Sequence, residues 1–190
     1  TSLLTTGYHR TADEIERRKS MAEKHYGTIV QYTGEGLDAG LILDAIRFDV
    51  RVQKNPTLYN QYAFRGSRNL NTGIFINYSI QNISFFSEVA MSHGAGKAAV
   101  GGFLLGAHRN FDVAIVYRNY QRDFHAFYTN AFSESTQPQN EQGLYWGWKY
   151  RWNRQYNFSG YFDLFTFPWL GFRRYAPSRG TRGAPSSRQS

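Results

Sequence analysis

The sequence contains no cysteine, comparatively few charges and no long apolar run. Without cysteine the chain cannot form disulfides, zinc–thiolate clusters or thiol nucleophiles. Charged residues make up 19% of the chain, below the roughly 25% of average globular proteins. No stretch approaches the roughly 20 apolar residues of a membrane-spanning helix. The first ten residues also lack the basic start and apolar stretch of a secretory signal. A secreted protein would then have to be in its mature form, or the chain is an internal fragment, which is the alternative we favour.

Aromatic residues are abundant, at 17% of the chain, yet the mean hydropathy is negative, at −0.56. This combination is unusual for a soluble core and suits a sheet that is apolar on one face and polar on the other. Part of the net charge of +8 lies near the C-terminus, where residues 173–190 contain no acid. The arginines there are Arg173, Arg174, Arg179, Arg182 and Arg188. We interpret residues 171–190 as a basic, disordered tail.

One segment has the pattern of a helix. Thr11 and Glu14 have the spacing of a capping box, in which each side chain can bond the other residue's amide. The sequence therefore predicts a capped helix from Ala12 to about Lys24, within an N-terminal segment of residues 1–26. Its apolar face is thin, so we expect this helix to lie on a surface or to plug an opening.

From Gly27 the hydrophobic period changes to two, which predicts β-strands. The clearest alternation covers residues 46–52, 69–80, 83–92, 111–118, 144–152 and 156–167. These segments approach the roughly 9–11 residues that cross a bilayer as a strand, and exceed the mode of about 5–6 in soluble sheets. Tight connections such as Gln81-Asn82 alternate with longer ones such as Asn119 to Glu141, as in outer-membrane barrels. Aromatic residues also collect near strand ends, which fits an interfacial girdle.

We therefore predict an all-β fold for residues 27–170: an antiparallel outer-membrane β-barrel of about eight strands, or an open curved sheet that is a fragment of one. One set of apolar side chains should point outward to lipid: Leu70, Ile74, Ile76, Tyr78, Ile80, Ile83, Phe85, Val89 and Met91. The opposite faces should line a lumen. The candidate lumen-facing polar residues are Arg47, Asp49, Arg51, Glu88, Asp112, Arg118, Lys149, Arg151 and Asp163. Their mixed signs are compatible with a selectivity lining or with internal ion pairing.

Motifs for chemistry are missing from the sequence. The five histidines have no metal-ligand spacing, and no nucleophile elbow or phosphate-binding loop is present. We therefore predict no catalytic, metal or cofactor-binding residue, no cofactor and no enzymatic activity. The most distinctive polar stretch, residues 117–135, interleaves aromatic rings with cations. Its candidate binding residues are Tyr120, Arg122, Phe124, His125 and Tyr128. They could stack on single-stranded nucleic acid or sugars, or the loop could fold its aromatics inward over the barrel mouth.

Several short motifs, in order, resemble a known family. They are Gly7-Tyr8-His9-Arg10-Thr11-Ala12 with Glu14-Ile15, Gln61-Tyr62-Ala63-Phe64 with Asn69-Leu70-Asn71, Asn82-Ile83-Ser84-Phe85-Phe86 with Glu88, Tyr117-Arg118-Asn119-Tyr120 with Asn130-Ala131-Phe132-Ser133-Glu134, Asn140-Glu141 with Gly143-Leu144-Tyr145, Phe167-Pro168-Trp169-Leu170, and Ala176-Pro177-Ser178. Through them the chain resembles the barrel-like region of Bacteroidetes helix-hairpin-helix domain-containing outer-membrane proteins. The resemblance covers residues 7 to about 180.

This resemblance implies an outer-membrane location in a Gram-negative cell and no enzymatic activity. The helix-hairpin-helix itself is absent from this chain, so its DNA link is carried over to no residue. After Gly180 the pattern departs from the family, where further strands are expected, so barrel closure is in question.

Three functions follow as hypotheses. The leading one is a structural or transport-associated barrel segment in contact with outer-membrane lipid and with the remainder of a larger barrel. The second is a nucleic-acid-binding module for DNA uptake, and the third is a soluble β-sandwich that binds sugar or protein. The sequence does not define an oligomeric state.

Overall fold

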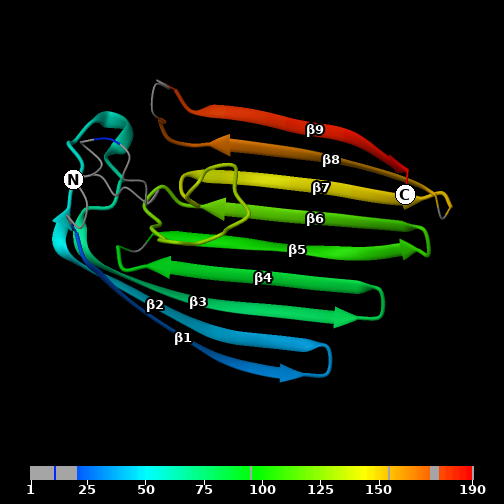
Figure 1. Ribbon diagram of the computed structural model, residues 1–190, viewed down its shortest axis with the longest axis horizontal. Coiled ribbons are helices and arrows are strands. Elements are labelled where there is room, and N and C mark those ends of the chain that lie inside the picture. The colour runs from blue at the N-terminus through cyan, green and yellow to red at the C-terminus, as the bar shows by residue number, and fades with distance from the viewer. Residues whose placement is uncertain (1–10, 12–20, 95, 154, 172–175, 190) are drawn as a thin grey trace.

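The computed structural model describes residue 11 and residues 21–94, 96–153, 155–171 and 176–189. These residues form one antiparallel sheet of nine strands, in which neighbours in sequence are neighbours in space (Figure 1). The strands are β1 (Glu23–Gly34), β2 (Leu37–Val52), β3 (Gly66–Ile80), β4 (Ile83–Ser92), β5 (Lys97–His108), β6 (Phe111–Tyr120), β7 (Glu141–Arg151), β8 (Tyr156–Phe167) and β9 (Ser178–Gln189). The only helical element in the described ranges is a 3-10 turn, Leu58–Asn60. It is too short to cross a membrane as a helix.

The all-β antiparallel prediction is confirmed, and so is the open sheet. β1 and β9 are the two edges, and no ladder joins them within the described chain. Several predicted bounds agree closely, because period-two alternation and turn chemistry coincide there. β8 spans the predicted residues, and the β3–β4 turn falls at Gln81-Asn82, where Gln81 adopts a φ of 51°. Such a left-handed φ belongs to the tightest hairpin turns.

Two predicted segments differ from the structure. The predicted helix ends inside a strand, because Glu23 and Lys24 begin β1 and pair with Phe48 and Arg47 of β2. Residues 12–20 of that prediction lie outside the described residues. The predicted disordered tail contains a ninth strand, β9, which pairs with β8 from Phe167–Ser178 to Tyr156–Gln189. The lack of apolar residues predicted disorder, but an edge strand can be held by backbone hydrogen bonds to its neighbour without apolar side chains.

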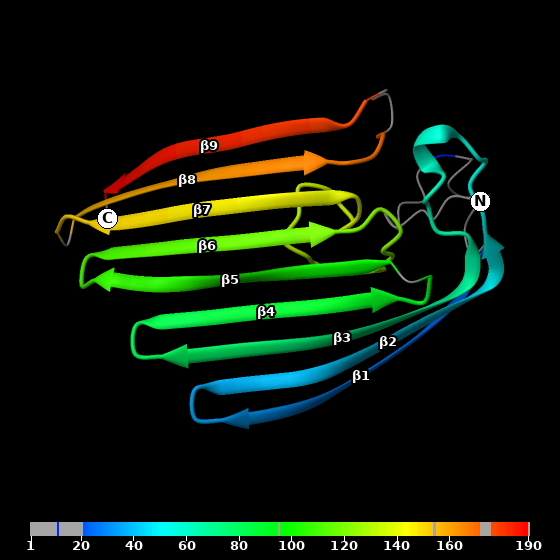
Figure 2. The same ribbon diagram turned by 180° about the vertical axis from the view of Figure 1, so that it is seen from behind.

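The registers divide the side chains into two faces. The outer face carries the nine residues predicted to point outward, since Ile80 pairs with Ile83, Tyr78 with Phe85 and Ile74 with Val89. All nine are exposed, from 40% for Ile76 to 62% for Ile74. In Figure 2, which shows the sheet from behind, the strands run without a described segment laid across them.

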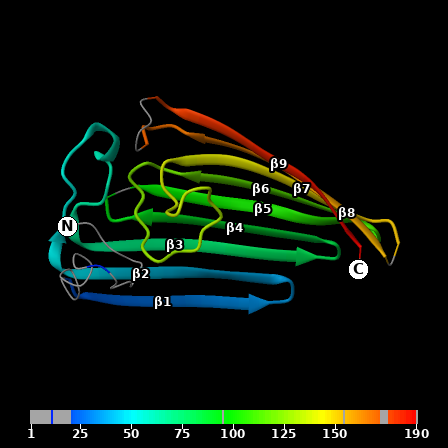
Figure 3. The same cartoon turned by 45° about the horizontal axis from the view of Figure 1, so that its top comes forward.

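The inner face is covered in part by the connection between β6 and β7. This segment, residues 121–140, lies over the middle strands (Figures 1 and 3). It contacts both edges of the sheet: Tyr128 donates to Glu23 of β1, and Arg182 of β9 pairs with Glu134. The sheet therefore curves around the segment, as Figure 3 also shows.

The small hydrophobic core lies between the segment and the sheet. One cluster is built on Ile46, Phe48 and Val52 of β2, with Phe64 and Phe127 packed against it. A second is built on Ala98, Tyr120 and Phe124. The core thus sits on the inner face at one end of the strands, while the outer face keeps its large apolar side chains exposed.

Candidate functional site

The inner face holds a buried ion cluster where β6, β7 and β8 lie side by side. The Arg118 guanidinium donates from Nε to Glu141 Oε1 at 2.6 Å. It also donates from both terminal nitrogens to the two oxygens of Asp163, at 3.0 and 3.1 Å. All three side chains are buried, with Arg118 only 1% exposed. Bidentate, charge-assisted geometry of this kind offsets the cost of removing the charges from water.

The same cluster fastens the segment to the sheet. Glu141 accepts hydrogen bonds from the backbone amides of Glu134 and Ser135, at 3.0 to 3.2 Å. The Phe132 ring covers the guanidinium at 5.2 Å, and the Tyr120 hydroxyl donates to the Phe132 carbonyl at 3.0 Å. Each buried polar side-chain atom of the described residues has a partner. The ion cluster therefore positions residues 132–135 against β6, β7 and β8.

Gly143 supplies the space for this arrangement. It faces Arg118 across the β6–β7 pair, and an added Cβ would lie 2.5 Å from Arg118 Cζ. The guanidinium cannot move aside, because two carboxylates hold it.

A second anchor lies at His125. Its backbone amide donates to Ser92 Oγ at 2.9 Å, and its carbonyl accepts from Ser92 Oγ at 3.1 Å and from Asn69 Nδ2 at 2.7 Å. Its ring packs edge-on against Phe64. Burial lowers the pKa of His125 below its ordinary value, and Asp123 opposes that shift.

A third group of contacts holds the two ends of the segment. Arg122 stacks over the rings of Tyr62 and Trp169, at 4.4 and 5.3 Å. Asn140 exchanges two hydrogen bonds with the backbone of Trp169. On the other side, Tyr128 donates to Glu23 at 2.7 Å. Desolvation first, and then the bond to Glu23 and its charge, raise the pKa of Tyr128 to about 12.

The five candidate binding residues of the loop therefore do not form one exposed platform. Tyr120 and Phe124 are buried, and His125 is half-buried. Arg122 already stacks on two rings, and Tyr128 alone among the aromatics of the set is largely exposed. This placement agrees with the alternative in which the loop folds its aromatics inward.

Six of the nine candidate lumen-facing residues lie on the inner face. Asp112, Lys149, Arg118 and Asp163 are placed there by the registers of β6, β7 and β8. Arg151 pairs with Asp112 at 3.4 Å, and Glu88 lies in a cavity with inner-face residues. Within the described residues, two ion pairs, Arg118–Asp163 and Arg151–Asp112, join these side chains. The charges do not form a ring of one sign.

The register contradicts the prediction for Arg47 of β2. Arg47 pairs with Lys24 and Arg68 on the outer face. Asp49 and Arg51 lie in the irregular part of the β2–β3 ladder, between Arg47 and Val52, where no register pair assigns them to a face. Both are exposed, while Phe48 and Val52 are buried. The alternation was recognised correctly, but the apolar half of this stretch faces inward, because Phe64 and Phe127 provide an apolar cover there.

Glu141 is the member of the ion cluster that the sequence did not suggest. It begins β7 directly after the long connection, so it resembles a loop residue. The alternation along β7 could have identified it. Glu141, Gly143, Tyr145 and Lys149 alternate with the apolar residues of β7, so they share the inner face.

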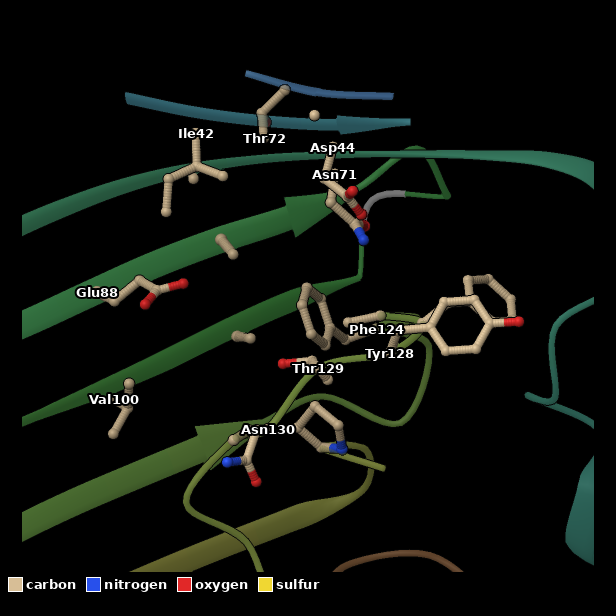
Figure 4. Close-up of a pocket in the computed structure, with 18 of the residues that line it drawn as sticks. Ile42, Asp44, Asn71, Thr72, Glu88, Val100, Phe124, Tyr128, Thr129 and Asn130 are labelled. Carbon is tan, nitrogen blue, oxygen red and sulfur yellow. The ribbon is translucent and has the colours of Figure 1, made fainter. Parts of the chain in front are cut away.

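Two cavities open on the inner face. The first, of about 670 Å³, lies between β1–β5 and the segment. Figure 4 shows Asp44, Asn71 and Glu88 on its sheet side, facing Phe124 and Tyr128 of the segment. The second, of about 600 Å³, lies nearer the short turns and includes Asp112, Lys149 and Tyr161. In the described ranges no three histidine, aspartate or glutamate side chains are grouped so that they could hold a metal.

No protein-family model matches the chain, and no curated protein matches it.

Proposed function

We propose that this chain is part of the wall of an outer-membrane β-barrel in a Gram-negative cell, with a structural or transport-associated role and no enzymatic activity. The observation that carries the proposal is the outer face. Every strand from β1 to β8 contributes large exposed apolar side chains to it. Examples are Val30 (67% exposed), Ile74 (62%) and Tyr117 (51%).

The distribution of charge on this face supports the same proposal. At the outer-face positions defined by the strand registers, the charged residues are Lys24, Arg47, Arg68, Lys97 and Arg179. All five lie at one end of their strands, beside the longer connections, and Asp49 and Arg51 lie at that end of β2. At the other outer-face positions that the registers of β1 to β9 define, the described residues carry no charge. An uncharged, apolar band bounded by charge matches a hydrocarbon layer bounded by head groups.

Aromatic residues mark the opposite end of the band. Tyr32, Tyr78, Phe111, Tyr150 and Tyr156 lie near the short turns. Amphipathic rings at this level are typical of the membrane–water interface. The outer face thus has the sequence of zones expected along the bilayer normal.

In this proposal the segment lies inside the barrel and narrows it. Its anchors to both edges of the sheet and the buried Arg118 cluster support a fixed constriction. The resemblance to barrel-like regions of Bacteroidetes helix-hairpin-helix proteins belongs to the same proposal, and it rests on the motifs alone.

The two alternatives have less support. A soluble sandwich needs a second sheet over the apolar face, and no described segment covers that face. A nucleic-acid module needs exposed aromatics among cations, whereas Tyr120, Phe124 and Arg122 are engaged with the protein itself.

The proposal is tested by fractionating cells that contain the full-length protein. We expect it in the outer-membrane fraction, resistant to alkaline carbonate, with faster gel migration before heating than after it. Recovery in the soluble fraction, with migration that heating does not change, would contradict the proposal.

A further inference from the structure

The outer-face cations of β1, β2 and β3 form a row at one end of the apolar band. Lys24 is the register partner of Arg47, and Arg47 is in turn the register partner of Arg68. Directly opposed side chains in an antiparallel sheet have Cβ atoms about 4.5–5.5 Å apart. Three positive charges therefore stand side by side on three neighbouring strands, and all three are exposed.

Such a row is unfavourable unless an anion joins it, because like charges directly opposite one another destabilise a sheet. No salt bridge or hydrogen bond to these three side chains occurs among the described residues. The nearest acids along the chain are already engaged: Glu23 accepts from Tyr128, and Asp49 accepts from the Ala22 amide. Among the residues described, no acid is therefore paired with a member of the positive row; Asp49, at the same end of β2, is hydrogen-bonded to a backbone amide instead.

We propose that Lys24, Arg47 and Arg68 bind the phosphate groups of anionic lipid head groups at the edge of the bilayer. This inference rests on the proposed membrane location, since it takes the adjoining apolar band to lie in the hydrocarbon layer. Arg47 and Arg68 can each present a planar fork of donors to phosphate oxygens, and Lys24 adds a compact charge. Lys97 and Arg179 lie at the same end of their strands and extend the positive edge.

The position of the row distinguishes lipid phosphate from a dissolved anion. The residues next to it along the strands, Tyr26 and Leu70, are apolar outer-face residues at 64% and 42% exposure. A phospholipid joins a phosphate to apolar chains. With the phosphate at the cation row, those chains would lie along the apolar band next to it. The surface therefore fits an amphiphile with a phosphate at one end.

The test uses the full chain with vesicles of phosphatidylcholine alone or of phosphatidylcholine with 30% phosphatidylglycerol, a proportion of roughly one anionic lipid in three that gives a strong surface potential. The variants are Arg47→Gln/Arg68→Gln and, as a matched control on the inner face, Lys149→Gln/Arg151→Gln. We expect the wild type to prefer the anionic vesicles. The outer-face variant should lose about 10- to 30-fold of that preference, at about fivefold per cation, and the control should keep it.

A second measurement separates binding from folding. In a zwitterionic detergent, without anionic lipid, Arg47→Gln/Arg68→Gln should unfold at the same urea concentration as the wild type or at a higher one, because the repulsion is reduced. If both variants had the same preference for anionic vesicles, or if the wild type had none, the inference would be overturned. Insertion into either kind of vesicle would still support the membrane location. Binding of inorganic phosphate that Arg47→Gln/Arg68→Gln abolishes, together with no preference of the wild type for the anionic vesicles, would assign the row to free phosphate and also overturn the inference. Failure to insert into either vesicle would count against both proposals.

Discussion

Among single residues, Arg118 has the largest expected effect on stability. Its replacement by methionine removes the charge that Glu141 and Asp163 share and leaves two carboxylates buried together. We expect Arg118→Met to lower the free energy of unfolding by about 3–5 kcal/mol, the usual cost of breaking a buried ion pair from one side. Urea denaturation measures this loss.

Arg151→Met is the matched control, because Arg151 pairs with Asp112 where both side chains are 43% exposed. We expect a change below about 1 kcal/mol there, since water screens the pair. If the two variants lost equal stability, the Arg118 cluster would not hold the segment in place.

His125 gives the segment a pH dependence. Its pKa in the folded protein lies below the ordinary 6.5 because its ring is desolvated. Between the folded and unfolded pKa values the unfolded chain binds a proton that the folded chain does not, so unfolding becomes easier as the pH falls below about 6.5. We expect His125→Gln to flatten this slope in urea titrations at successive pH values. An unchanged slope in His125→Gln would refute the assignment.

At the level of secondary structure, adjacent residues of β3 point to opposite faces of the sheet and therefore lie in different environments. Ile76 lies on the outer face, and its neighbour Asn77 lies on the inner face beside Asp38. In lipid, Ile76→Arg should cost about 2–4 kcal/mol if the residue lies near the midplane. Asn77→Arg should cost little, because it faces a polar interior with an acid in reach. Refolding into vesicles at a series of urea concentrations measures both, and equal costs would contradict the orientation.

The strands were predictable where local signals agreed and were missed where a distant partner decided. Alternating residues and a tight turn predict β3, β4 and β8, since both signals lie within a few residues. β9 is a strand because β8 offers it a backbone ladder, and its own small and basic residues give no sign of this. The inward side of β2 depends likewise on Phe127, far away in the chain. The Arg118–Asp163 pair is a contact of the same long-range kind.

For the molecule as a whole, strand direction restricts how the sheet can close. Every neighbouring pair is antiparallel, so β1 and β9 run in the same direction. A closed antiparallel barrel that contains this sheet therefore requires an odd number of further strands between β9 and β1, which gives the even total usual for such barrels.

Engineered disulfides can check that β1 and β9 are not neighbours. The chain has no cysteine of its own, so every thiol is an introduced one. Leu164→Cys with Thr181→Cys joins register partners of β8 and β9 and should form a disulfide. Thr181→Cys combined in turn with Thr28→Cys, Val30→Cys or Tyr32→Cys should not, because a disulfide needs Cα atoms within about 7 Å. A high yield of any β1–β9 disulfide in the monomer would show a closed nine-stranded sheet.

The membrane account depends above all on which face of the sheet meets lipid, and a cysteine scan of β3 in the full-length protein in native membranes measures this directly. Single cysteines at positions 73 to 80 would carry a spin label whose collisions with oxygen report lipid and whose collisions with a water-soluble nickel chelate report water. We expect oxygen contact at 74, 76, 78 and 80 and nickel contact at 75, 77 and 79, a period of two that follows the two faces of the strand. Nickel contact at all positions, or protection of 74, 76, 78 and 80 from both reagents, would contradict the account.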